Sequence, residues 1–176
     1  LNLATVGSIE LSKAADITSN VLSGFGLSAS ETNRVVDVLA KSSTSANVTI
    51  ESLGESFKEI SSTAKVLNIP IEEVGAAINT LGNSGIKGTA ATNTLQSSLL
   101  RLADPTKKAK DSLSSVGVEL FDSEGEFIGL TETVDVLGDS FKELTTEQQL
   151  AAASQIFGKN AANNWLTVLG STKDVL

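Results

Sequence analysis

The sequence contains no cysteine, histidine, methionine or tyrosine. These absences exclude disulfides, thiolate nucleophiles, imidazole bases and zinc sites built from Cys and His. Basic residues are also few, since 13 Lys and Arg stand against 21 Asp and Glu, for a net charge of −8. A nucleic-acid-binding surface needs a basic footprint, so the charge argues against one. No apolar run approaches the roughly 18 residues of a membrane-spanning helix, and no signal peptide is visible.

The chain of 176 residues, 40% of them hydrophobic, is long enough to bury a core without disulfide bonds or structural metal ions. We expect a single helical domain over residues 1–176, with possible sub-units at 1–87 and 88–176. Because the chain starts with Leu1 rather than Met, we interpret it as a piece of a longer protein.

Apolar residues recur at alternating intervals of three and four, which draws one stripe down a helix. One stripe lies within residues 50–67 and a second within residues 71–81. Each stripe lasts only two or three heptads, which is too short for a long coiled coil. The pattern therefore predicts a mainly α fold, a compact bundle of short helices arranged as helical hairpins.

The expected helix ends carry recognisable residues. Capping boxes at residues 28–31 and 145–148 predict two helix starts. Pro70 suits the first turn of another helix, and Asp104 with Pro105 can end one helix and begin the next. Glycines suit the expected stops, at Gly82, Gly85, Gly117 and Gly158.

One stretch departs from the helical pattern. Residues 118–121 alternate apolar and polar, as do residues 126–128, and residues 122–125 between them have the composition of a turn. We therefore expect one small β-hairpin near residues 118–129, lying against the helices.

An internal similarity links residues 49–60 and 133–144, which are identical at seven of twelve positions. Either two amphipathic helices look alike by chance, or a helical unit has been duplicated. Gly54 and Gly138 lie mid-helix at matching points, which predicts close helix–helix approach there.

Two glycine-rich stretches superficially resemble nucleotide-binding loops. In residues 82–89, Ile86 and Gly88 flank Lys87, where a phosphate-binding loop needs a glycine before the lysine and Ser or Thr after it. Residues 24–29 mimic a dinucleotide fingerprint, but no strand precedes them. We interpret both stretches as connections between helices.

The remaining candidates for chemistry are weak. Asp122, Glu124 and Glu126 could bind a hard cation, but their segment lacks the length of a calcium loop and suits a plain turn. Trp165 lies among apolar residues at helical spacing, which favours a core or interface anchor. No serine has the setting of a nucleophile. We predict no catalytic residue, cofactor, metal site or enzymatic activity.

The order of motifs resembles the core region of tape measure proteins of long-tailed bacteriophages and prophages. The resemblance covers about residues 15–170, and the polar stretch at residues 42–47 departs from the family's alanine-rich pattern. The segments that carry it are residues 25–31, 35–40, 53–60, 67–73, 76–78, 85–89, 99–106, 113–125, 156–158 and 161–162.

The resemblance implies a structural protein that scaffolds assembly of the tail tube and sets tail length. It implies contacts with tail tube, tail tip and tail assembly chaperone proteins, possible self-association, and no nucleic acid or membrane partner for this segment. It also implies residence in the host bacterial cytoplasm during assembly and in the lumen of the virion tail afterwards. Because short stripes must fold back on one another, we expect this segment to anchor or nucleate assembly while flanking sequence acts as the ruler.

Two alternatives remain open. A helical protein-interaction module of a bacterial scaffold or signalling protein would share the same stripes and caps. A hydrolase or enzyme accessory domain would need acids that converge in a concave pocket.

Overall fold

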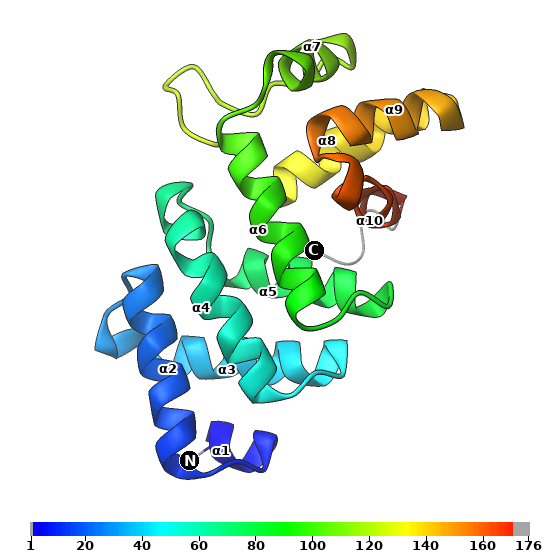
Figure 1. The fold of residues 1–176 in the computed structure, drawn as a ribbon. Coiled ribbons are helices and arrows are strands. Elements are labelled where there is room, and N and C mark those ends of the chain that lie inside the picture. The colour runs from blue at the N-terminus through cyan, green and yellow to red at the C-terminus, as the bar shows by residue number, and fades with distance from the viewer. Residues whose placement is uncertain (1, 171–176) are drawn as a thin grey trace. The chain divides into compact units, whose positions relative to one another are not determined.

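A computed structural model describes residues 2–170 of the chain, which are mainly helical, as the sequence predicts (Figure 1). The elements in chain order are α1 (Asn2–Gly7), α2 (Leu11–Phe25), the short 3₁₀ helix η1 (Ala29–Glu31), α3 (Thr32–Ala46), α4 (Ile50–Val66), α5 (Ile71–Asn83), α6 (Thr89–Ala103), α7 (Lys107–Ser115), α8 (Leu130–Lys142), α9 (Thr146–Ile156) and α10 (Lys159–Gly170).

The chain divides into two compact units between Asn93 and Thr94. This point lies inside α6, so the first turn of that helix belongs to the first unit and the rest to the second. We call residues 2–93 unit 1 and residues 94–170 unit 2.

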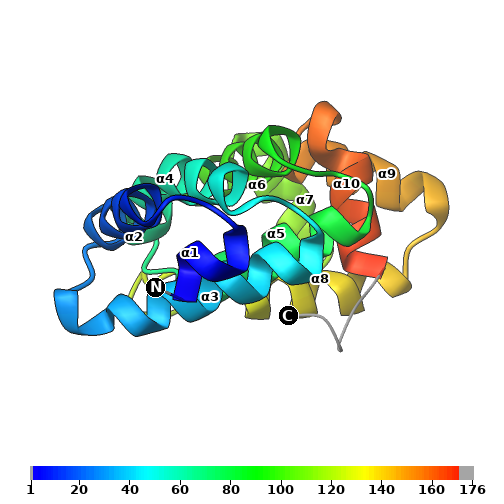
Figure 2. The ribbon, with the colours of Figure 1, turned by 90° about the horizontal axis from the view of Figure 1, so that it is seen from below.

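The helices of unit 1 form two layers (Figure 2). Helix α2 packs against α4 and α3 against α5, while α3 also contacts α1, α2 and α4. The two predicted stripes supply much of the core, and all of their apolar positions are buried: Ile50, Leu53, Phe57, Ile60, Ala64, Leu67, Ile71, Val74, Ile78 and Leu81.

Glycines let α2 and α4 approach each other closely. A β-carbon on Gly54 would lie 2.7 Å from Cγ2 of Ile17 on α2, and one on Gly24 would lie 2.7 Å from Cβ of Ser61 on α4. The expected close approach at Gly54 is therefore confirmed. Its counterpart Gly138 is buried in α8, and the duplication stays a prediction.

In unit 2, α9 packs against α7 and α10, and α10 also contacts α8. Phe157 and Trp165 stack with ring centroids 4.5 Å apart and planes 7° from parallel. The Trp165 indole N–H also donates to the Ser98 hydroxyl at 2.6 Å. Trp165 is only 1% exposed. It therefore anchors α10 to the part of α6 that belongs to unit 2.

The capping boxes form as predicted: Glu31 accepts from the Ser28 backbone N–H, and Gln148 accepts from that of Thr145. Two other boundaries were wrong by one or two residues. Pro70 is the N-cap rather than a first-turn residue. Helix α7 begins after Thr106, whose hydroxyl accepts from the Ala109 N–H, so Asp104 is not its cap.

The predicted β-hairpin near residues 118–129 is wrong, because no strand occurs within residues 2–170. Only an isolated antiparallel bridge joins Phe121 to Phe127. The Asp122 carboxylate instead accepts from the backbone N–H groups of Glu124 and Glu126, both at 2.9 Å. Two backbone hydrogen bonds accompany the bridge, from the Asp122 N–H to the Glu126 carbonyl at 2.9 Å and from the Ile128 N–H to the Leu120 carbonyl at 3.0 Å, and the pairing extends no further into strands.

Candidate functional site

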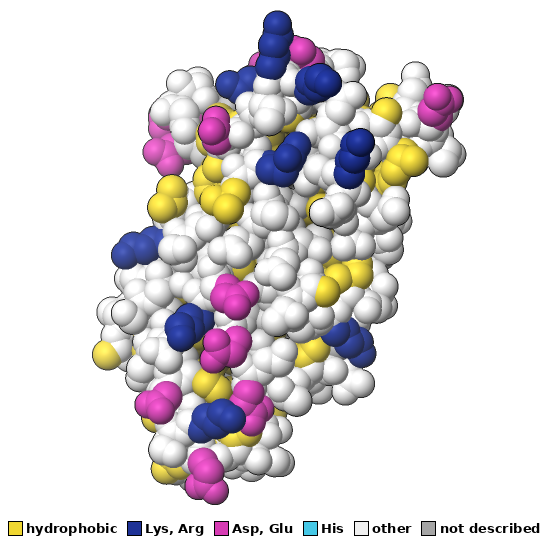
Figure 3. Space-filling view, in the orientation of Figure 1, with side chains coloured by type: hydrophobic (Ala, Val, Ile, Leu, Met, Phe, Trp, Pro, Cys, Tyr) yellow, Lys and Arg dark blue, Asp and Glu magenta, His cyan; other side chains and the backbone are white. Residues whose placement is uncertain are grey.

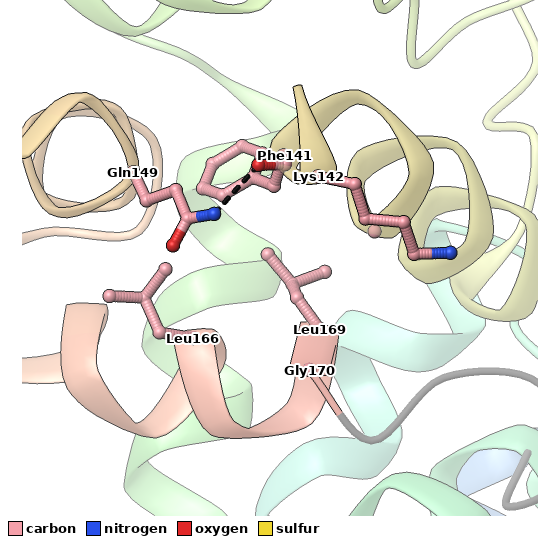
Figure 4. A pocket seen from close by; sticks show the side chains of 7 residues that line it. Phe141, Lys142, Gln149, Leu166, Leu169 and Gly170 are labelled. Carbon is pink, nitrogen blue, oxygen red and sulfur yellow. Dashed lines mark hydrogen bonds between the residues drawn. The ribbon is translucent and has the colours of Figure 1, made fainter. Parts of the chain in front are cut away.

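A depression of about 160 Å³ lies among α8, α9 and α10 in unit 2 (Figure 4). Its walls are mainly apolar and include Phe141, Leu166 and Leu169. The Gln149 amide N–H donates to the Phe141 carbonyl at 2.7 Å and to the Leu144 carbonyl at 3.3 Å, so it closes the C-terminal end of α8. Lys142 points away in Figure 4 and pairs with Asp139 at 2.7 Å. The polar groups here serve the fold rather than converge on a ligand.

A second depression, of about 230 Å³, lies in unit 1 beside Phe25, Pro70 and Arg34. The Arg34 guanidinium donates to both carboxylate oxygens of Glu72, at 2.5 and 2.7 Å, and to Glu31 at 2.8 Å. These hydrogen bonds hold the pKa of the Glu72 carboxyl below its ordinary value. The pKa of Glu31 is also lowered, first by the Ser28 backbone N–H and then by Arg34. The guanidinium charge is thus already balanced by two carboxylates.

The glycine-rich stretch at residues 82–89 connects α5 to α6. Gly85 and Gly88 have positive φ values of 85° and 56°, which suit glycine in a tight connection. The preceding segment is helix α5 rather than a strand, so the arrangement differs from that of a phosphate-binding loop.

The acidic stretch at residues 122–126 is a turn. Asp122 is used in folding it, and no group of three or more acids suited to hold a metal occurs within residues 2–170. Trp165 is buried against Phe157, as expected of a core anchor.

The sequence analysis missed the role of Arg101 on α6. Its guanidinium donates to the carbonyls of Gln155 at 3.1 Å and Ile156 at 3.2 Å, at the C-terminal end of α9. A positive charge there complements the helix dipole. The spacing of 54 and 55 residues between donor and acceptors leaves no local sequence signal for this contact.

These features define a helical protein in which the polar clusters cap helices and close turns. None of the helices in the described range combines the length and apolarity needed to span a membrane. No curated protein and no solved structure matches the chain. The model of the phage-related minor tail protein family does match, over residues 1–158, and the chain belongs to that family.

Proposed function

We propose that the chain is the folded core of a tape measure protein, and that it anchors or nucleates tail assembly rather than acting as the ruler itself. Membership of a phage tail family supports the structural tail role. The order of motifs across the chain supports the tape measure in particular.

The observation that carries the anchoring role is the shortness of the helices. The longest described helix, α4, has 17 residues and spans about 26 Å at 1.5 Å per residue. A single helix over the same residues 2–170 would span about 250 Å. Since the apolar stripes are buried within compact units, each unit has little reach of its own and suits a fixed point in assembly.

In this proposal the chain acts in the host cytoplasm during assembly, where it contacts tail tube, tail tip and chaperone proteins, and it then lies in the tail lumen. We propose no enzymatic role for it, in keeping with a structural tail family. The carboxylates of Asp122, Glu31 and Glu72 each accept hydrogen bonds from backbone or arginine donors. A scaffold or signalling module is not favoured, since the family is one of phage tail proteins.

The test uses two variants of the phage gene that encodes this chain, one with codons 2–170 deleted and one with them duplicated in frame. We expect the deletion to abolish tails and the duplication to leave tail length unchanged in electron micrographs. Normal tails from the deletion would contradict the tail-assembly role. Tails about 250 Å longer from the duplication would contradict the anchor and support a ruler.

A further inference from the structure

Three lysines form an exposed basic edge at the start of α7, namely Lys107, Lys108 and Lys110. The dipole of a helix disfavours positive charge in its first turn, and this turn holds no acidic residue. Within the described residues, none of the three lysines forms an ion pair. The basic edge therefore does not serve the stability of α7.

An apolar depression of about 300 Å³ lies beside this edge, between α7 and the loop that follows it. Leu113, Leu120 and Phe121 are among its apolar walls. Lys110 lines it from α7 and Glu119 lines it from the loop, and the two charges are not paired with each other. The depression is thus flanked by opposite charges that the folded unit leaves unneutralised.

The loop side of the depression leads to an acidic edge, made of Glu119, Glu124 and Glu126. All three side chains are exposed, and none forms an ion pair among residues 2–170. Asp122 is not counted, because its carboxylate accepts backbone N–H groups in the turn. Figure 3 shows Lys and Arg side chains gathered over α7 with an acidic side chain among them, and acidic and hydrophobic side chains over the loop beside it. Helix α7 also carries the exposed Asp111, directly after Lys110.

We propose that this face binds a second copy of the chain about a two-fold axis. A two-fold contact pairs one surface with itself, so the basic edge of each copy meets the acidic edge of the other and the apolar depressions close on one another. The charge layout selects this occupant, since one surface carries both signs. A nucleic acid would meet the acidic edge and has no apolar side chain for the depression.

This inference goes beyond the proposed tail role, because it concerns a contact of the chain with itself, and its test needs no phage. The test is sedimentation equilibrium of the purified chain at concentrations up to about 1 mM, the range of weak contacts. We expect a dimer that dissociates as salt rises, because salt screens exposed charges.

Two charge-reversed variants make the test specific. One carries Lys107→Glu, Lys108→Glu and Lys110→Glu. The other carries the reverse change at the acidic edge, Glu119→Lys, Glu124→Lys and Glu126→Lys. We expect each variant alone to dimerise at least about tenfold more weakly, and an equal mixture of the two to associate again, because the reversed edges are then complementary.

The matched control replaces Lys41, Lys58 and Lys87 by Glu, which changes the net charge equally outside this face. It should dimerise about as well as the unmodified chain. Circular dichroism should show that the α7 variant melts no lower than the unmodified chain, because acids suit a helix start. A wild-type chain that stays monomeric, or a mixture that fails to associate, would overturn the proposal.

Discussion

The two units differ in how closely their helices meet, although unit 1 also buries a ring pair, Phe25 and Phe57, with centroids 6.0 Å apart. In unit 1, small residues let backbones approach closely, as where Gly24 faces Ser61 and Gly54 faces Ile17. In unit 2, large rings fill the space between helices, with Trp165 stacked on Phe157. The comparison teaches that unit 1 should be damaged by added atoms and unit 2 by removed atoms, since packing fails in opposite directions.

The largest effect is expected from Trp165→Ala in unit 2. The change removes the stack on Phe157 and leaves the buried Ser98 hydroxyl without its indole donor, so the free energy of unfolding should fall by about 3–5 kcal/mol. Urea titration followed by circular dichroism measures this loss. Trp165→Phe, which keeps a ring but lacks the N–H, should lose about 1–3 kcal/mol.

Hydrogen exchange locates the damage from Trp165→Ala. Protection should fall more over residues 94–170 than over residues 2–93, because the removed side chain packs within unit 2. An equal loss in both units would contradict the view that each unit has its own packing.

An intermediate effect is expected from Gly24→Ala in unit 1. The new β-carbon would meet Cβ of Ser61 at 2.7 Å, and the forced shift should lower the free energy of unfolding by about 1–3 kcal/mol. Adding Ser61→Gly should restore most of the loss. Gly170→Ala, where nothing lies within 4 Å, should stay within about 0.5 kcal/mol. If both alanines behave alike, close approach does not explain the glycine at position 24.

The smallest effect is expected at the Arg34 cluster. The lowered pKa of Glu72 means that its ion pair stabilises the folded state above pH 4.5, the ordinary value, and that this contribution is lost as pH falls below it. At pH 7, the free energy of unfolding of Arg34→Gln should therefore be lower than that of the unmodified chain by about 0.2–1 kcal/mol, the usual range for such an exposed pair. The gap should close towards pH 3. Lys41→Gln is the control and should show no such closing gap.

Helix positions could be predicted where the signal is local. The stripes at residues 50–67 and 71–81 and both capping boxes needed only neighbours within one or two turns. Serine and threonine disfavour helices in general, because their side chains compete for backbone hydrogen bonds. The structure shows them inside helices with their hydroxyls donating to the carbonyl four residues earlier, as at Thr18, Thr80 and Thr133.

What the sequence could not predict depends on distant partners. Arg101 caps a helix more than fifty residues away, and Thr92 donates to Ser56 of α4, 36 residues earlier. The hairpin prediction failed for a local reason. The alternation at residues 118–121 fits a strand, but the Asp122 carboxylate accepts two backbone N–H groups of the turn, and the loop between α7 and α8 forms only the bridge from Phe121 to Phe127.

Hydrogen exchange of the unmodified chain tests most directly the claim that these short helices are held by packing against one another. Isolated helices of this length are marginal in water, so strong protection must come from tertiary contacts. We expect amides on the buried faces of α4 and α10 to exchange several orders of magnitude more slowly than free peptides. Exchange of both helices at the rate of unstructured chain would contradict the account.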